Sequence, residues 1–413
     1  HGDTFMALAS TSRVQLSYIK EVTFGVTPIA GTVRKLRITG ESLNFTINKE
    51  TSSEINDSRS SSSMIPTSAE AAGGVQAEMQ FAEYDPFIEA TLQSTFSGIG
   101  GTGVGTAFEA TITATDITAT VAPIGTSAFT TLQPGQWFTL DGTSSANDGK
   151  LFRVSKTTAP TTTVITLDPG TPGVAGGPYV ATKVLAARLT NGVTQPSFTL
   201  QRTIGDVGEY FSFRGMTASS MSLSVASGSL STVEFSFMGR DSLQDDATLL
   251  PAVVTDSQSY QIMSGVSGTT CALWANGAPL AGTFINSISF SYDNSLRQQT
   301  ALCALGAIGI GSGQINCTAD IEVYFASGAT FYQEMLDNTN IEIAFTSYDA
   351  QGNGYIFTLP TANVSSYTVN ASGGSDSDLM ASISLTALRD AANTVPALRK
   401  VLFIDRVGAP LLA

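Results

Sequence analysis

The sequence predicts an all-β fold with short flanking helices, and two observations favour it. Thr, Ser, Gly and Val are abundant whereas Lys and Glu are sparse, a composition that suits short strands and tight turns better than long helices. Several segments alternate apolar and polar residues with the period of two that a half-buried strand requires. The chain has 413 residues, enough for two or three domains with separate cores.

The N-terminal third contains the clearest element signals. Residues 43–47 place three apolar side chains on one face of a predicted strand, and residues 75–81 place four. Residues 85–92 predict a short helix, because they begin with Asp-Pro and carry apolar residues at helical spacing. Between the two strands, residues 50–74 are rich in Ser and small residues, so we expect a polar connection that orders on binding. Residues 14–28 are expected to form an exposed arm.

The same elements return in the C-terminal third. Residues 288–292 repeat the first strand, 319–325 repeat the second, and 331–336 repeat the helix. Counted along the chain, Phe45 precedes Phe290 by 245 positions and Phe87 precedes Phe331 by 244. These steady offsets indicate an internal repeat.

A second block repeats at a shorter offset. Tyr210, which opens a strand-like run, precedes its counterpart Tyr355 by 145 positions, and residues 233–237 match 383–385. The first copy therefore carries about 100 more residues than the second. We interpret the chain as a tandem duplication of one β-domain with a small β-domain inserted in the first copy. Glycines near residues 98–103 and 176–178 predict flexible joints at the ends of the insertion.

This interpretation divides the chain into six parts. They are an N-terminal arm (1–30, with 1–5, ahead of Met6, expected to be a tag remnant), the first β-domain (31–101 and 188–245), the inserted outer β-domain (102–187), a linker (246–280), the second β-domain (281–395) and a C-terminal tail (396–413).

Charge and cysteine usage restrict the partners. Charged residues make up only 13% of the chain, against about 25% in typical globular proteins, so we expect partner subunits to cover much of the surface. The net charge of −14 and the lack of clustered Lys and Arg argue against wrapped nucleic acid, whereas an acidic wall past which DNA slides fits the sign. No apolar run is long enough to span a bilayer. The three cysteines lack CxxC spacing, so we expect buried thiols from a reducing cytoplasm.

The motifs of catalysis and cofactor binding are missing from the sequence. The single histidine is His1, which removes histidine-based triads and most zinc sites. Residues 98–103 match GxGxxG in form, but they follow a helix instead of a strand. Residues 349–354 favour a hairpin turn over a calcium loop, and Trp137 favours a core position in the inserted domain over a sugar platform. We predict no enzyme activity and no cofactor.

The amino-acid sequences of three N-terminal segments resemble those of a known protein family. Residues 18–28 (YIKEVTFGVTP), 36–43 (LRITGESL) and 52–55 (SSEI) resemble the N-terminal region of major tail tube proteins of long-tailed, siphovirus-type bacteriophages. The likeness is good over residues 14–95 and is limited to strand pattern over 190–395. The insertion resembles the small outward-facing domains that some tube proteins carry.

The resemblance implies a structural virion protein of the tail, made in the host cytoplasm. Family members have a β-sandwich or barrel domain whose strands join those of neighbours into a ring, and stacked rings conduct DNA during genome ejection without binding it specifically. Six tube domains form a family ring, so two copies in one chain imply a trimer with pseudo-sixfold symmetry, with a hexamer of whole chains as the alternative. A tape measure protein and a tail terminator are the further partners expected from the family.

The resemblance and the strand pattern also assign candidate site residues. The candidates for the lumen face are Gln76, Glu78, Gln80, Asp320 and Glu322. A solvated outer surface would serve these residues equally well. The candidates for ring-stacking loops are Ser60, Met64, Ile65, Leu302, Leu305 and Ile308. The alternative function is another β-rich phage or cell-surface protein that is structural, adhesive or carbohydrate-binding, although the sequence shows no secretion signal and no clustered aromatic residues.

Overall fold

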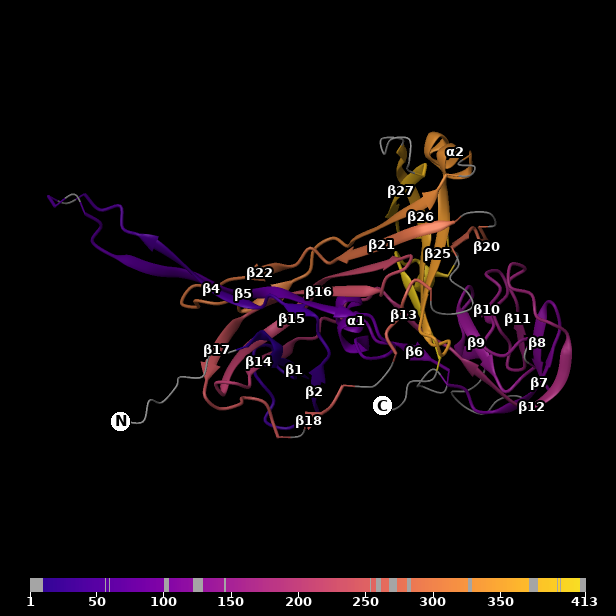
Figure 1. The fold of residues 1–413 in the computed structure, drawn as a ribbon, viewed down its shortest axis with the longest axis horizontal. Helices are drawn as coiled ribbons and strands as arrows, with labels where there is room; N and C mark the ends of the chain where they lie inside the picture. Colours follow the sequence, from indigo (N-terminus) through magenta and orange to yellow (C-terminus); the bar gives the residue numbers. More distant parts are fainter. Residues whose placement is uncertain are drawn as a thin grey trace.

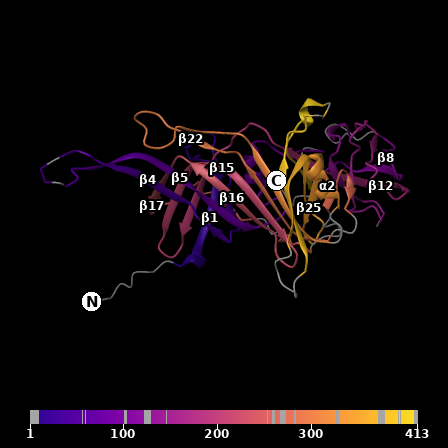
Figure 2. The ribbon, with the colours of Figure 1, turned by 90° about the horizontal axis from the view of Figure 1, so that it is seen from above.

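The fold was derived from a computed structural model of the chain (Figures 1 and 2). It describes residues 10–55, 57–58, 60–99, 104–121, 129–144, 146–252, 254–257, 261–266, 273–280, 284–325, 329–370, 378–391, 393 and 395–408. Two helices and many strands make this an all-β protein, as the sequence predicts. Figure 1 shows a long hairpin arm (β4 and β5) at one end of the molecule and a separate group of strands (β7–β12) at the other.

Most strands belong to one extensively branched sheet. Its N-terminal half contains β1 (Val14–Lys20), β2 (Val33–Leu36), β3 (Gly40–Glu41), β4 (Asn44–Thr51), β5 (Met64–Glu78), β6 (Ser97–Gly98), β13 (Ala187–Thr190), β14 (Phe198–Ile204), β15 (Glu209–Ala226), β16 (Thr232–Gly239) and β17 (Asp241–Asp245). Its C-terminal half contains β18 (Val254–Thr255), β19 (Leu273–Ala275), β20 (Ala278–Pro279), β21 (Ile285–Asp293), β24 (Asn316–Tyr324), β25 (Asn340–Tyr348), β26 (Gly354–Asn370), β27 (Met380–Ala387) and β28 (Phe403–Val407).

The remaining elements are short or belong to the insertion. A six-stranded system contains β7 (Phe108–Ile112), β8 (Asp116–Ala119), β9 (Trp137–Asp141), β10 (Leu151–Arg153), β11 (Val164–Thr166) and β12 (Gly176–Leu185). The helices are α1 (Asp85–Leu92) and α2 (Ala329–Asp337), and β22 (Arg297–Gln299) pairs with β23 (Gly309–Gly311). The 3-10 turns among the described residues are η1 (Thr11–Arg13), η3 (Phe129–Thr131) and η4 (Pro396–Leu398).

The first β-unit forms around α1 for reasons visible in its sequence. Pro86 lies in the first turn of α1, where its missing N–H costs no hydrogen bond, and Gln93 ends the helix in the left-handed conformation. Phe87 packs edge-to-face on Phe198 and Phe235, so the helix is buried against β14 and β16. Alternation in β16 buries Val233, Phe235 and Phe237 and leaves polar residues between them.

The second β-unit repeats the strand pairing of the first. In the first unit β5 pairs with β16, β16 with β15, and β15 with β14 and β17. In the second, β24 pairs with β27, β27 with β26, and β26 with β25 and β28. The registers agree as well, since Ala77 pairs with Val233, and its counterpart 244 positions later, Ile321, pairs with Ile383.

One detail of the predicted repeat is wrong. Phe290 pairs with Ala319, and the counterpart of Ala319 in the first unit is Val75, which pairs with Glu41. The strand β21 therefore corresponds to residues around Glu41, four positions before Phe45. The alternation near Phe45 misleads because it continues into the protruding hairpin arm, where Ile47 is exposed.

The predicted polar connection at residues 50–74 is mostly strand. β4 and β5 pair along their length and form the arm, and only residues 52–63 lie between them. Gly73, at φ +148°, lets β5 pass close to β3, because a Cβ there would lie 2.4 Å from the carbonyl oxygen of Ser42. The prediction found the end of β5 at residues 75–78 but missed residues 64–74, because the strand begins with exposed residues on both faces and such a sequence carries no apolar alternation.

Three other predicted boundaries are wrong. β1 is not an exposed arm, since it pairs with β14 and β2 and buries Leu16, Tyr18 and Ile19. The predicted linker contributes β18, β19 and β20 to the large sheet. The predicted C-terminal tail contributes β28, which pairs with both β13 and β26 and buries Ile404.

The inserted domain has its own core but is docked on the second β-unit, so the prediction that it hangs on flexible joints is wrong. Trp137 is fully buried between the insertion and that unit, its ring centroid 4.9 Å from that of Trp274. The indole Nε1–H of Trp137 donates to Thr358 Oγ1 (3.1 Å) on β26. The predicted joint at residues 176–178 is part of β12.

A buried ion pair joins three parts of the chain. Arg188 on β13 donates two hydrogen bonds of 2.7 Å to Asp405 on β28, and both side chains are almost completely buried. Arg188 also donates to the carbonyl of Gly135 in the insertion (2.8 Å), and Asp405 accepts from the backbone N–H of Trp137 (3.1 Å). The folded chain thus supplies hydrogen-bond partners for both buried charges.

This arrangement predicts that the insertion and both units unfold together. Replacing Arg188 with Met should lower the free energy of unfolding by about 3–5 kcal/mol, because Asp405 would remain buried without its counter-charge. Arg13→Met, which removes the exposed pair with Asp206 (3.0 Å), should change it by less than about 0.5 kcal/mol. Denaturant unfolding of both variants provides the comparison, and equal small losses would contradict the inferred role of the buried pair.

Candidate channel face and assembly edges

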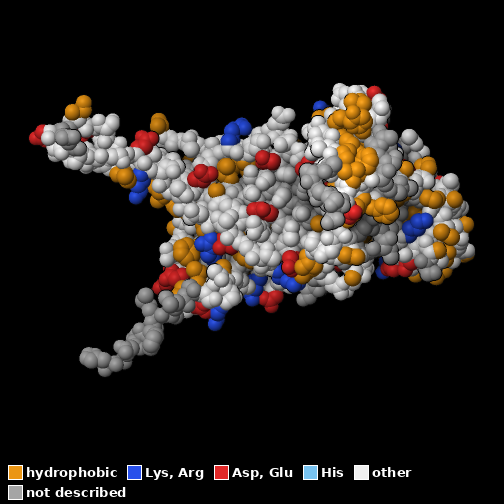
Figure 3. All heavy atoms as spheres, turned by 45° about the horizontal axis from the view of Figure 1, so that its top comes forward, with side chains coloured by type: hydrophobic (Ala, Val, Ile, Leu, Met, Phe, Trp, Pro, Cys, Tyr) orange, Lys and Arg blue, Asp and Glu red, His pale blue; other side chains and the backbone are white. Residues whose placement is uncertain are grey.

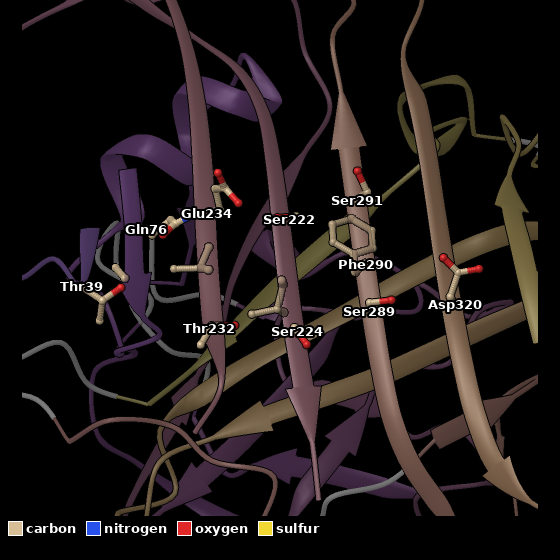
Figure 4. A pocket seen from close by; sticks show the side chains of 13 residues that line it. Thr39, Gln76, Ser222, Ser224, Thr232, Glu234, Ser289, Phe290, Ser291 and Asp320 are labelled. Carbon is tan, nitrogen blue, oxygen red and sulfur yellow. The ribbon is translucent and has the colours of Figure 1, made fainter. Parts of the chain in front are cut away.

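A polar face lies on the sheet where the two β-units meet. Here β5, β16, β15, β21 and β24 lie side by side, because β15 pairs with β21 and so joins the units into one continuous sheet. A shallow depression on this face is drawn in Figure 4. Its lining residues are Thr39, Gln76, Ala77, Ser222, Leu223, Ser224, Thr232, Val233, Glu234, Ser289, Phe290, Ser291 and Asp320.

Strand alternation explains why this face is polar. In β15, β16 and β21 the apolar residues Leu223, Val233 and Phe290 are buried in the common core. The residues between them therefore point the other way, and they are mostly Ser and Thr. Figure 3 shows the molecule with the top of Figure 1 turned forward. Few charged side chains are scattered over the mostly uncoloured surface there.

The charges on the lining have one sign. Glu234 and Asp320 are its only ionisable residues, and no Lys or Arg is among them. Asp320 is exposed and accepts a hydrogen bond from Ser384 Oγ (2.6 Å), which leaves its charge uncompensated by a base. A polyanion near this face would meet repulsion instead of binding.

The predicted lumen residues lie in different surroundings in the structure. Gln76 and Asp320 both line the face, at equivalent positions in β5 and β24. Glu78 and Glu322 lie two residues further along the same strands and are half-buried, Glu322 accepting from the amide of Asn286 (2.8 Å).

Gln80 does not belong to this set. Its side chain is 1% exposed and accepts a hydrogen bond from Arg37 (2.9 Å), because β5 ends at Glu78 and the chain turns inward before α1. The prediction extended the alternation past the end of the strand.

The sequence analysis missed Glu234 and the serines of β15. The signal was present, since residues 232–237 alternate as regularly as the strands that were selected. It was overlooked because the candidate lumen residues were taken from only two strands, whereas the polar face is built from five.

The predicted stacking residues occupy two neighbouring protrusions. Ser60, Met64 and Ile65 are exposed near the end of the arm. Leu302, Leu305 and Ile308 are exposed on the loop between β22 and β23. The loop rests on the arm through a hydrogen bond from the Ala69 N–H to the Leu305 carbonyl (2.9 Å), so the protrusions form one projecting body.

The two helices differ sharply in burial. Ile88 and Leu92 of α1 are 0% exposed, whereas Tyr332 and Leu336, which stand 244 positions later in α2, are 47% and 58% exposed. The helix α1 is covered by the second β-unit, where Arg406 on β28 pairs with Asp85 and Tyr355 Oη also donates to Asp85. No equivalent cover lies on α2 among the described residues. Figure 3 shows hydrophobic side chains gathered at the end of the molecule where α2 lies.

The buried ionisable groups have structural partners. Burial, with the nearby Asp85 carboxylate, raises the pKa of Tyr355 well above its ordinary value. Burial is the largest single effect and would lower the pKa of Arg406, but the charge and hydrogen bond of Asp85 together with Tyr355 and Glu89 outweigh it and raise that pKa. Both groups keep their protons and serve to fix α1 between the units.

The described part of the chain lacks two further classes of site. It contains no group of three or more His, Cys, Asp or Glu residues arranged to hold a metal ion. None of its helices has the length and apolar character needed to cross a bilayer. The loop at residues 349–354 is a hairpin turn between β25 and β26, as predicted, with Asp349 N–H bonded to the Asn353 carbonyl (2.9 Å).

Comparison with known proteins identifies the family. The family model of phage tail tube proteins matches residues 11–387, nearly the whole chain, and the chain belongs to that family. No curated protein matches the sequence. The chain is therefore a structural component of a phage tail that assembles into a tube.

Proposed function

We propose that this tail tube protein is the major tube subunit of a long-tailed, siphovirus-type phage, with three chains in each ring. The observation that carries the proposal is the repeated strand pairing of its two β-units, which β15 and β21 join into one continuous sheet. Each unit acts as one tube domain, so three chains supply the six that the family resemblance implies. A ring of six whole chains is the alternative.

Tandem duplication accounts for the repeat. The equivalent ladders β5–β16 and β24–β27 share both direction and register, and each unit places its helix after the same strand. Convergence of unrelated sheets would not keep the register over matched residues. The first unit then acquired the insertion between α1 and β14, and its counterpart connection, between α2 and β25, is short.

The polar face is proposed to line the channel. Ring closure places one face of a central sheet inside, and Gln76, Glu234 and Asp320 line a polar face to which both units contribute. DNA leaving the capsid would slide past hydroxyl groups and isolated acids without adhering. The tape measure protein would occupy the same channel before ejection, and the tail terminator would close the end of the tube.

Charge reversal tests the channel assignment. Tubes of a Glu234→Lys, Asp320→Lys variant should assemble, because both side chains are outside the core, but they should retain DNA and slow genome ejection. Retention should weaken steeply as salt is raised, since it depends on phosphate contacts. Ejection is measured by DNA release from assembled particles.

A matched control separates the channel from the outer surface. Asp116 and Glu109 lie on β8 and β7 of the insertion, and changing both to Lys reverses the same number of charges there. This control should eject DNA normally. Normal ejection by the Glu234→Lys, Asp320→Lys tubes would count against the channel face, and six whole chains per ring in images would refute the trimer.

The insertion is proposed to be an outer domain that tube formation does not require. Replacing residues 102–186 with a Gly/Ser linker should leave tubes intact but lower the melting temperature, because Trp274, Tyr348 and Ile356 would lose the cover of Trp137 and Leu151. Electron microscopy and calorimetry measure the two effects. A variant that stays folded yet forms no rings would show that the insertion belongs to the tube wall.

A further inference from the structure

The strands β15 and β26 are equivalent, but β15 has one partner more. The first half of β15 pairs with β14 and β17, and its second half pairs with β16 on one edge and β21 on the other. The first half of β26 pairs with β25 and β28, and its second half pairs with β27 alone. Along residues 364–369, no described strand pairs with the other edge of β26.

The segment formed by β3 and β4 also lacks a partner strand that its counterpart has. Its counterpart β21 pairs with both β24 and β15, whereas β3 and β4 pair only with β5 among the described strands. The described strands thus include these two unpaired edges, and within the chain the equivalent edges are joined to each other. An unpaired edge exposes a row of backbone donors and acceptors that can accept a further strand.

We propose that the second half of β26 pairs antiparallel with residues 38–44 of the next chain, in the register that β15 and β21 show within one chain. This inference rests on the proposed ring. It identifies the strand pairing that joins neighbouring chains, which we call the seam. In the chain, Ser222 pairs with Ser291 and Leu223 with Phe290. The equivalent seam pairs are Ser366 with Ser42, and Tyr367 with Glu41.

The register follows when the two units are aligned through β5 and β24 at the offset of 244 positions. β26 and β15 are aligned by their partners, since Tyr367 pairs with Ile383 as Leu223 pairs with Val233. β21 and β3 are aligned by the pairings of Phe290 with Ala319 and of Glu41 with Val75. The same register places Val369, which is 39% exposed, opposite Thr39.

The exposed side of α2 belongs to the same seam. Within the chain, β28 covers α1, and its residue Ile404 is 0% exposed on the face that carries Arg406 to Asp85. The strand equivalent to β28 is β17, since each pairs with the first half of the long strand of its unit, and Leu243 of β17 is 42% exposed. In the ring, β17 of the next chain covers α2 as β28 covers α1. Leu243, Tyr332 and Leu336 are then buried together, which explains the apolar surface at that end.

Such a contact is head-to-tail, since the β26 side of one chain meets the β3 side of the next. Contacts of this kind form a ring when the rotation closes. The ring therefore has two kinds of junction with the same strand pairing. One lies within a chain and the other lies between chains.

Cysteine pairs test the register. In a background with Cys271 and Cys303 changed to Ser, Ser42→Cys with Ser366→Cys should form disulfides between chains in assembled tubes. Directly opposite residues in an antiparallel pair lie about 4.5–5.5 Å apart, within the range a disulfide spans. The product on a non-reducing gel should be a ladder that ends at three chains.

Two matched variants calibrate this result. Ser222→Cys with Ser291→Cys should form a disulfide within one chain, which shows the yield for the same register at the internal junction. Asn44→Cys with Ser366→Cys tests a slip of two residues and should not cross-link, because diagonal neighbours lie about 7–8 Å apart. Efficient cross-linking of the slipped pair would overturn the register. Tubes that form normally without cross-linking the Ser42 pair would overturn the seam while leaving the proposed function intact, and an absence of tubes from the unmodified chain would refute the function itself.

Charge placed in the seam tests the second contact. Leu336→Asp and Leu243→Asp should each give folded chains that no longer form rings, because both side chains are exposed in the single chain and buried in the seam. Val180→Asp, at a 75% exposed position on β12 of the insertion, is the control and should assemble normally. Light scattering and circular dichroism report assembly and folding separately. Normal tubes from both seam variants would show that β17 does not cover α2.

Discussion

The architecture depends on the length of one strand, β15. With 18 residues it is long enough for its two halves to lie in different branches of the large sheet, the first with β14 and β17 and the second with β16 and β21. The second branch presents the polar face. One continuous strand connects the two branches, and β21 connects the second β-unit to them.

A second constraint fixes the insertion. Burying Arg188 and Asp405 is costly unless every charge is paired, and the partners come from β13, β28 and the loop containing Gly135. The three parts of the chain must therefore be in place together. The prediction of flexible joints failed for this reason, since glycines indicate where a chain can bend but say nothing of a buried pair between residues that lie 217 positions apart.

The sequence predicts well what local alternation encodes. Strands with one buried face, such as β16 and β24, and the helix begun by Pro86 were recognisable because their patterns reflect the core directly. The arm was missed because a strand in solvent has no apolar face, and β28 was missed because its five residues are mostly buried and do not alternate. Gln80 was misassigned since alternation does not reveal where a strand ends. The candidate face was predicted in part, and Glu234 was overlooked although its strand alternates.

The two β-units differ where their surroundings differ. The helix of the first unit is enclosed by its own chain, and Asp85 there is neutralised by Arg406, an interaction that one polypeptide can form as it folds. The helix of the second unit has apolar residues at positions 332 and 336 although they are exposed in the single chain. Exposed apolar groups at these positions are unfavourable for an isolated chain and useful only when another chain covers them. A junction within the chain can rely on buried charge because its partners always meet, whereas a junction between chains gains from an apolar contact that tolerates solvent before assembly and is stabilised by water release afterwards.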